Sequence, residues 1–340
     1  MNTIPSTFED SLPAYTVVGG GKRNASTGLC AVLLNRGGIY RNSCFEELQN
    51  TGFDYVLSME NSGEHFDIEE LSALFPFVRF ILFKDEPNIG QKINVAALEA
   101  DTPLFFVLWD DFHPVFNLDA GRISSRLQIK NDEGVRRANG RNSFTRLCTV
   151  PVIQNSDFEP LPCARAPVID GKKFETMPFT PVKDGMPSLY PFEAAGVYDR
   201  ERFISLGGFD PKLNLRHWQL LDFGLRAWLW GEEIRCTQQI RFRLDVNVNA
   251  ENGTADDSYF RFFLKNLAPV IQEENETSGK NPGRTAAHLP LRYFLPYLFK
   301  SGCGLSGAWR TFLEIRGWVT FHKFRFVKDI NTVASFWRQP

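Results

Sequence analysis

The sequence predicts an α/β protein built on a Rossmann-like, doubly wound and mostly parallel sheet, followed by a C-terminal helical extension rich in basic and aromatic residues. Two observations support this fold class. From Cys30 onward, short apolar runs alternate with segments of helical periodicity, which is the pattern of βαβ units. The run at 104–109 is apolar without interruption, which indicates a strand buried on both faces of a sheet.

The elements follow one another closely in the first third of the chain. Four apolar runs have the length of strands: 30–34, 54–58, 78–83 and 104–108. Three segments between them have helical spacing: 44–49, 68–75 and 89–98. Ser43 is a suitable cap for the first of these helices because Glu46 stands at the capping-box position, and Pro76 ends the second.

The alternation is interrupted between 112 and 190, where Pro-containing strand-like pieces are joined by polar loops such as 130–141. Loops of this length are typical of lids and binding loops. Regularity returns at 195, and a long helix is predicted from 217 to 230, closed by Gly231. We expect a loosely ordered segment at 1–28, one large domain at 29–250 and the extension at 251–340.

Composition excludes several classes of protein. The 340 residues carry a net charge of −2, so nothing in the overall charge indicates nucleic-acid binding. The six cysteines are scattered without a C-x-x-C pair, which fits reduced thiols in a cytoplasm. The sequence lacks a signal peptide and has no apolar stretch of ~20 residues that would span a membrane. These features favour a soluble or peripheral protein of the cytoplasm, and they leave its oligomeric state open.

The last fifty residues alternate basic and aromatic side chains. Against the acidic Glu314 and Asp329 stand eight basic residues: Arg292, Lys300, Arg310, Arg316, Lys323, Arg325, Lys328 and Arg338. This pattern suits a surface that lies in the headgroup layer of an anionic membrane, so 291–340 is a candidate for peripheral association with the inner face of the cytoplasmic membrane. The alternative is a helical appendage whose aromatic side chains pack onto the main domain.

Two adjacent carboxylates, Asp110 and Asp111, follow the strand at 104–108, and His113 comes two residues later. Side chains just beyond the carboxyl end of such a strand line the crevice where open α/β sheets bind ligands. Carboxylates and an imidazole there can hold a divalent cation, which in turn binds a diphosphate. The alternative is a solvated Asp-Asp turn.

Further motifs stand before and after this pair. In chain order the segments are Glu60-Asn61, an N-x-G…N…A pattern at 88–100, the aspartate pair at 110–111, Leu-Gly-Gly-Phe-Asp at 206–210, and an Asp…Arg…Gly helix at 222–231. Together they resemble the signatures of nucleotide-sugar glycosyltransferases of the GT-A fold, and glycosyltransferase family 2 in particular. The resemblance runs from about 30 to 235, with a gap in the irregular middle. It implies a nucleotide-binding half at 29–114 and an acceptor half at 115–250.

The resemblance also implies roles for individual residues. Mn²⁺ or Mg²⁺, held by Asp110, Asp111 and His113, would neutralise the diphosphate of a UDP- or GDP-sugar. The residues that would face this donor are Asn35, Arg36, Glu60, Lys92, Asn94 and Asp110. Those that would face the acceptor are Gly208, Phe209 and Trp218. The acceptor itself would be a glycan of the cell envelope, a lipid-linked saccharide or a protein.

Two departures from the family pattern affect the mechanism. The leading aspartate of D-x-D is replaced by Leu108 or Trp109, and Asp111-Phe112-His113 instead matches the D-x-H that retaining polypeptide N-acetylgalactosaminyltransferases use to hold manganese. Gln219-Leu220 stands where inverting members carry Glu-Asp with the general base, and glutamine cannot take up a proton at neutral pH. Asp222 and Asp210 are then the candidates for the base, and the stereochemistry of transfer stays open.

Two other functions compete with glycosyl transfer. The Gln219-Leu220 departure also fits a degenerate GT-A module that binds nucleotide or glycan without catalysis. A nucleotidyltransferase shares the carboxylate-held metal, but it normally has a longer Gly-rich loop after the first strand than the one at 35–38.

Overall fold

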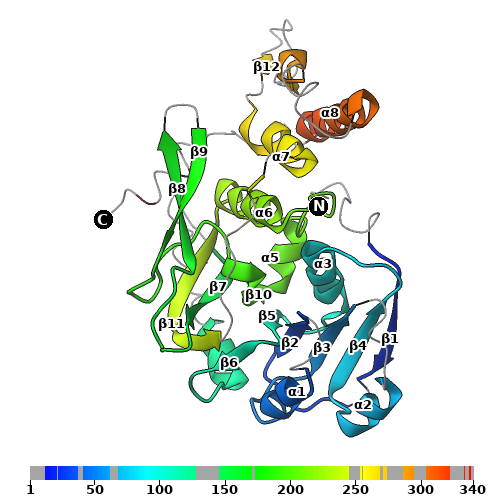
Figure 1. Cartoon of the computed structure of the whole chain (residues 1–340), viewed down its shortest axis with the longest axis vertical. Helices are drawn as coiled ribbons and strands as arrows, with labels where there is room; N and C mark the ends of the chain where they lie inside the picture. Colours follow the sequence, from blue (N-terminus) through cyan, green and yellow to red (C-terminus); the bar gives the residue numbers. More distant parts are fainter. Residues whose placement is uncertain are drawn as a thin grey trace, which may run out of the picture.

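In the computed structural model (Figure 1) the protein is a nine-stranded sheet covered by helices, with a smaller C-terminal unit beside it. The structure describes residues 12–20, 22–36, 41–61, 68–127, 145–170, 173–244, 253–254, 256–268, 271–273, 286–294, 304–321, 333 and 337. The polar loop at 130–141 and much of the basic segment after 321 lie outside these ranges.

Four parallel strands form the N-terminal half of the sheet, in the order β4-β3-β2-β5. They are β2 (Leu29–Leu34), β3 (Val56–Glu60), β4 (Val78–Phe83) and β5 (Leu104–Trp109). The helices that connect them are α1 (Arg41–Gln49), α2 (Ile68–Leu74) and α3 (Ile89–Glu99). This confirms the α/β, doubly wound fold that the alternating pattern predicts.

The strand order places a topological switch point between β2 and β5. The chain moves outward from β2 through β3 to β4 and then returns to the other side of β2 with β5. Open α/β sheets bind ligands at the carboxyl ends of the strands where such a reversal occurs. The residues that follow β2 and β5 therefore share the position in the fold where a ligand site is expected.

The second half of the sheet adds antiparallel pairs. The strands are β10 (Gly196–Asp199), β7 (Thr145–Gln154), β11 (Glu232–Leu244) and β6 (Phe112–Pro114). Of these described strands, only β7 and β11 pair in parallel. At the opposite edge, β1 (Tyr15–Gly19) pairs antiparallel with β4, so the segment predicted to be loosely ordered supplies an edge strand. The hairpin of β8 (Ala164–Asp170) and β9 (Lys173–Phe179) forms a separate sheet.

Helices cover both faces of the sheet (Figure 1). α1 and α2 lie on one face, whereas α3, α5 (Arg200–Ser205) and α6 (Arg216–Trp230) lie on the other. Beneath α5 and α6 the core is aromatic: Phe105 stacks on Tyr198 with ring centroids 5.1 Å apart, and Phe203 packs against both rings. The fully apolar run of β5 is buried along its whole length, as its sequence predicts.

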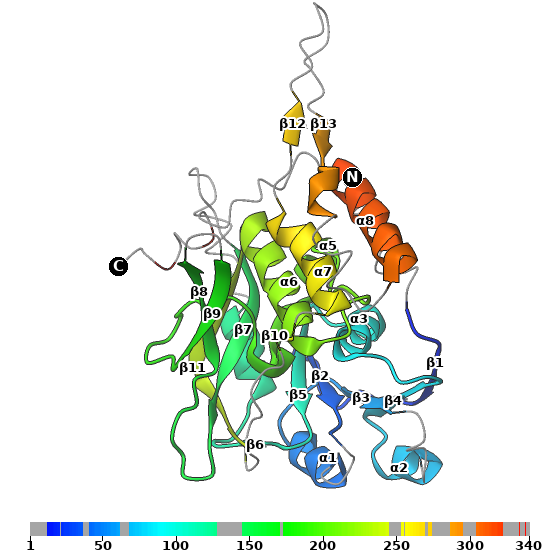
Figure 2. The same ribbon diagram turned by 45° about the horizontal axis from the view of Figure 1, so that its top comes forward.

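The C-terminal unit packs on the α6 side of the sheet (Figure 2). Its elements are α7 (Asp257–Phe262), the π-helix η2 (Phe263–Leu267), β12 (Ile271–Glu273), β13 (Ala286–His288), the 3₁₀ turn η3 (Leu291–Tyr293) and α8 (Gly304–Phe321). A small core of its own includes Phe260, Leu264, Phe294 and Phe312. Among the described residues, no helix combines the length and the apolar character needed to cross a bilayer.

Candidate functional site

The candidate site begins where β2 and β5 end side by side. Leu34 and Trp109 are partners in the parallel register, so Asn35 and Arg36 continue next to Asp110 and Asp111. The backbone N–H of Arg36 donates to Asp110 Oδ1 at 3.0 Å, and that of Asp110 donates to the Leu34 carbonyl at 3.0 Å. The switch point therefore brings together two carboxylates, an amide and a guanidinium, all of which the sequence places in the donor site.

The Arg36 guanidinium lies at the centre of this group. Its Nε is 3.0 Å from Asp111 Oδ2, and its Nη2 is 2.8 Å from Glu193 Oε2. The guanidinium carbon is 4.0 Å from the centroid of the Trp109 ring, which is a cation–π contact. Two carboxylates and one aromatic face therefore fix the orientation of this cation.

Glu193 belongs to the site although the sequence gives no signal for it. It lies in the turn η1 (Phe192–Ala194), is 1% exposed and pairs with both Arg36 and Arg216. Its carbonyl oxygen accepts a hydrogen bond from Trp109 Nε1 at 2.8 Å. The residue has φ 54°, and Ala194 has φ 60°. Such left-handed conformations cost free energy in non-glycine residues and cluster at functional sites.

Two buried acceptor atoms at the switch point have no hydrogen-bond partner in the described structure, Asn35 Oδ1 and Asp111 Oδ1. Burial, together with the charge of Asp111, raises the pKa of Asp110 even though the backbone of Arg36 donates to it. An unpaired buried oxygen is unfavourable, and a bound cation or donor removes that cost. The two aspartates and Asn35 therefore have the chemistry of an incomplete cation site.

The described residues contain no group of three or more His, Cys, Asp or Glu side chains that would hold a metal without further ligands. His113, which the sequence places as a third ligand, lies on β6 with its Nδ1 3.9 Å from Glu47 Oε1 of α1. Mg²⁺ sites commonly use one or two carboxylates and take further ligands from substrate phosphates and water. Asp110 and Asp111 fit a site of this kind.

Other predicted donor residues gather at the neighbouring strand ends. Glu60 is fully buried at the end of β3, where it accepts from Ser58 Oγ at 2.6 Å and from Asn35 Nδ2 at 3.3 Å. Lys92, in the first turn of α3, donates to Asn61. Asn94 differs from these, because its amide exchanges two 2.9 Å hydrogen bonds with the backbone of Phe209. Asn94 thus ties α3 to the following half of the domain.

The three residues predicted to bind the acceptor pack against, or form hydrogen bonds with, other residues in the interior of the protein. Phe209 is 1% exposed and stacks on Phe223 with ring centroids 4.4 Å apart. The Gly208 carbonyl accepts from Arg226 Nη2 at 2.6 Å. Trp218 packs against Phe262, and its Nε1 donates to the Thr254 carbonyl at 2.9 Å. This placement favours packing roles for all three.

Gln219, which replaces an acidic residue of the family pattern, is a buried cross-link. Its Oε1 accepts from the backbone N–H of Gly90 at 2.9 Å, and its Nε2 donates to Asn88 Oδ1 at 2.9 Å and to the Asp210 carbonyl at 3.2 Å. A Cβ at Gly90 would come within 2.4 Å of Gln219 Nε2, so glycine is required for this approach. A glutamate at 219 would lose the donor that these acceptors need.

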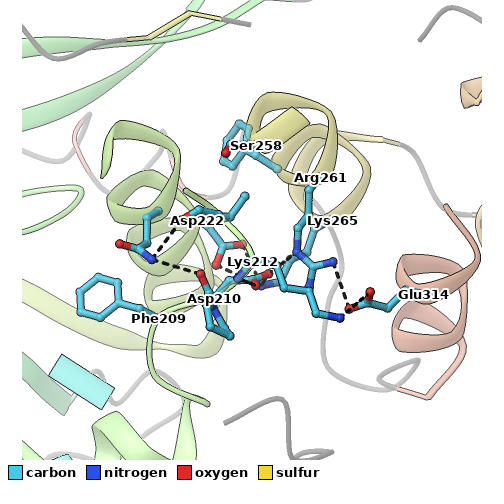
Figure 3. A network of polar contacts seen from close by, with 12 residues as sticks. Phe209, Asp210, Lys212, Asp222, Ser258, Arg261, Lys265 and Glu314 are labelled. Atoms are coloured by element: carbon cyan, nitrogen blue, oxygen red, sulfur yellow. Dashed lines mark hydrogen bonds and ion pairs between the residues drawn. The ribbon is translucent and has the colours of Figure 1, made fainter. Parts of the chain in front are cut away.

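Asp210 and Asp222, the two candidates for the general base, lie in a buried ionic network (Figure 3). Lys265 Nζ is 3.0 Å from both carboxylates, Arg261 Nε is 2.8 Å from Asp210, and Arg226 Nε is 2.8 Å from Asp222. Burial raises the pKa of each aspartate, but the neighbouring cations outweigh it and hold each pKa below its ordinary value. Saturated, strongly acidic carboxylates at these positions favour a structural role over that of a base.

Comparisons with known proteins find similarity to solved structures at low sequence identity. No family model matches the chain, and no curated protein matches it in sequence. It is similar to the crystal structure of GalNAc-T7 with UDP, GalNAc and Mn²⁺, with 12% identity and a TM-score of 0.48, over 70% of this chain and 49% of that one. It is also similar to S. aureus TarS 1–349, with 11% identity and a TM-score of 0.42, over 64% and 60% of the two chains. The chain thus spans about half to three fifths of these structures.

Proposed function

We propose that the protein is a metal-dependent GT-A glycosyltransferase that moves a sugar from a UDP- or GDP-sugar to a glycan, a lipid-linked saccharide or a protein. One observation carries the proposal: buried oxygens of Asn35 and Asp111, which have no hydrogen-bond partner among the described residues, lie at the switch point of a parallel sheet, beside Asp110. The motif resemblance in the sequence supports the choice of a nucleotide-sugar as the ligand.

Several residues of the site would contribute to binding a diphosphate, each in a different way. Asp110 and Asp111 would hold Mn²⁺ or Mg²⁺, which when bound stabilises the negative charge of the leaving nucleoside diphosphate. Arg36 keeps a second positive charge beside them and is fixed by its contacts with Asp111, Glu193 and Trp109. Glu60 engages the amide nitrogen of Asn35, which leaves the amide oxygen for the ligand.

Glu193 acts in this proposal as a positioning residue. Its carboxylate joins Arg36 to Arg216, at the start of α6, and its backbone fixes the Trp109 indole. The two arginines occupy the same Glu193 oxygen, so the carboxylate is engaged in orienting cations. It places the guanidinium where the diphosphate charge would develop.

Binding without transfer is the second candidate function. It is favoured by the interior placement of Asp210 and Asp222 and by the amide at Gln219, which together leave the family's base position without an available carboxylate. Both functions need the same donor site, and they differ in whether a product forms.

A thermal-shift screen tests the donor site. With Mn²⁺ present, a UDP or GDP nucleotide or its sugar conjugate should raise the melting temperature by several degrees, because a ligand at ~100 times its Kd adds about 2.7 kcal/mol. Asp111→Asn should abolish the metal-dependent part of this rise, whereas Asp157→Asn, at an exposed loop aspartate, should keep it.

A product search with the nucleotide-sugar that binds then separates the functions. Sugar transfer or hydrolysis supports the enzyme, and binding without turnover on any acceptor supports the module. Release of pyrophosphate from a nucleoside triphosphate would instead identify a nucleotidyltransferase. If no nucleotide stabilises the wild-type protein, the donor site itself is wrong.

We also propose that α8 binds the enzyme to the inner face of a membrane. Leu305, Trp309 and Leu313 are spaced four residues apart on this helix and are 66%, 41% and 46% exposed. Exposed basic residues, Arg310 and Arg316, belong to the same helix. An apolar stripe accompanied by arginines suits the headgroup layer of an anionic bilayer.

Vesicle sedimentation tests this location. The protein should bind vesicles of phosphatidylglycerol and phosphatidylcholine several-fold better than vesicles of phosphatidylcholine alone, because about 1 kcal/mol per basic residue depends on the anionic surface. Leu305→Asp with Leu313→Asp should abolish binding without changing the melting temperature. Equal sedimentation of the wild type and this double variant would refute docking through α8.

A further inference from the structure

A cavity of about 390 Å³ lies between β7, β11 and the segment 116–127 that follows β6. Thr149 on its wall pairs with Val197 of β10, which pairs with Phe106 of β5. Thr149 therefore lies at the same level of the sheet as Phe106, two strands away from β5. Phe106 precedes Asp110 by four positions in the sequence. None of the residues assigned to the candidate site lines this cavity.

The charge of the lining is strongly positive. Among the described residues, the cavity lining has four arginines and one carboxylate: Arg122, Arg126, Arg146, Arg241 and Asp119. The Arg241 guanidinium donates to the carbonyl and side-chain oxygens of Gln238 at 3.0 and 3.3 Å, and that of Arg126 donates to Gln239. Because these partners are neutral, they satisfy hydrogen bonds without compensating the charge.

Arg146 differs from the exposed Arg122 and Arg126 in being partly buried. Its side chain is half-buried and has neither a hydrogen bond nor an ion pair with any described residue. Nearby Glu233 is taken by Arg235, at 2.6 and 2.7 Å, and Asp184 accepts from Thr237 Oγ1 at 2.7 Å. Burial and the charge of Arg235 lower the pKa of Arg146. An anion beside this guanidinium would stabilise its charge and so offset both effects.

A second, independent feature on the same wall also lacks a partner. Thr149 Oγ1 is buried without a hydrogen bond in the described structure. A hydroxyl can donate to an oxyanion, and arginine matches phosphate and carboxylate oxygens with two parallel hydrogen bonds. Phe116, Leu127 and Ile240 add apolar surface for the carbon part of a ligand.

We propose that this arginine cavity is a binding site for a small anion that carries phosphate or carboxylate groups, separate from the donor site. Its volume lies in the range of pockets for small organic ligands. A ligand there would bridge the segment 116–127, which follows β6, to β7 and β11. Arg146 and Thr149 form the inner wall, and Arg122 and Arg126 form the exposed rim.

Calorimetric titration with inorganic pyrophosphate and with citrate, both in EDTA, tests the proposal on the full chain. At least one probe should bind the wild type, and Arg146→Gln should weaken it by at least tenfold. Arg310→Gln, at an exposed arginine of α8, should leave the affinity unchanged. A preference for pyrophosphate identifies the natural ligand as a phosphate, and a preference for citrate identifies it as a carboxylate.

The melting temperatures of the wild type and of Arg146→Gln provide a second test, which does not rely on a measured affinity. Without a probe, Arg146→Gln should melt at the wild-type temperature or above it, because the variant loses a partly buried charge that lies beside Arg235 and has no ion pair among the described residues. The probe should stabilise the wild type and not the variant. Failure of both probes to bind the wild type, or equal affinity in Arg146→Gln, would overturn the assignment.

Discussion

Replacing Asp222 by asparagine is expected to lower the free energy of unfolding by about 3 kcal/mol or more, the usual cost of breaking a buried ion pair from one side. The substitution keeps the shape of the side chain and leaves Arg226 and Lys265 buried, with part of their charge uncompensated. Both cations lie within 3.0 Å of Asp222 oxygens, and Asp222 is fully buried. Chemical denaturation of wild type and variant gives the difference directly.

The same network makes stability depend on pH. The folded-state pKa of Asp222 and that of Asp210 are lowered, so both carboxylates stabilise the fold fully above their unfolded pKa of about 3.9. This contribution is lost as the pH falls from there towards the lower folded values. Asp222→Asn should therefore show a shallower loss of stability between pH 5 and pH 3, as an approximate window, than the wild type.

A control variant and a double variant test the structural role of Asp222. Asp157→Asn, at an exposed position, should change the free energy of unfolding by less than about 0.5 kcal/mol. Replacing Asp222 and Lys265 together by Asn and Met should recover part of the lost stability, because the buried amine is removed with its partner. If Asp222→Asn keeps wild-type stability but loses transfer activity, Asp222 is the base after all.

Replacing Asp111 by asparagine is expected to reduce turnover about 100-fold or more, since ~3 kcal/mol of charge stabilisation corresponds to that factor. The change removes a negative charge from the cation site and keeps an oxygen near Arg36, whose Nε lies 3.0 Å from Asp111 Oδ2. Stability should stay within about 1 kcal/mol of the wild type. Turnover at saturating donor, measured over a range of Mn²⁺ concentrations, is the readout.

Two further variants and the pH dependence of Mn²⁺ binding test the roles of the residues around Asp111. His113→Ala should weaken Mn²⁺ as strongly as Asp111→Asn if the imidazole is a ligand, and should have little effect if it stays beside Glu47. Glu193→Gln should raise KM for the donor more than it lowers kcat, because it loosens Arg36 without touching the metal. Acid should weaken Mn²⁺ binding as Asp110, whose pKa is raised, takes up a proton. Wild-type turnover in Asp111→Asn would refute the metal assignment.

The sequence predicts the parallel half of the sheet well because each βαβ unit is a local pattern. The four strand runs and the helices between them fall within a few residues of the observed elements. The aspartate pair is equally local, since an apolar strand that stops at two carboxylates specifies its own position at the edge of the sheet. The antiparallel pairs of β10 and β6 depend on contacts between distant segments, and no periodicity in the sequence encodes them.

Residues that act through distant partners are harder to identify from the sequence. Glu193 contacts Arg36 across 157 positions of sequence, and nothing around it distinguishes it from a surface glutamate. Asn94 and Phe209 are motif residues that the resemblance places at the site, but in the structure their hydrogen bonds and packing connect the two halves of the domain. A motif identifies which residues matter together, and it does not tell a ligand contact from the scaffold that supports one.

The π-helix η2 sets limits on where the chain can be cut. Its backbone hydrogen bond from Ala268 N–H to the Phe263 carbonyl is 2.8 Å long and spans five residues. Because of this wider turn, the sequence neighbours Lys265 and Asn266 both reach Asp222. Deleting one residue here would restore α-helical pitch and rotate one of the two away. A fragment ending near 250 would keep Asp210 and Asp222 but lose their partners from 261–266, so we expect the sheet domain to need the C-terminal unit for its stability.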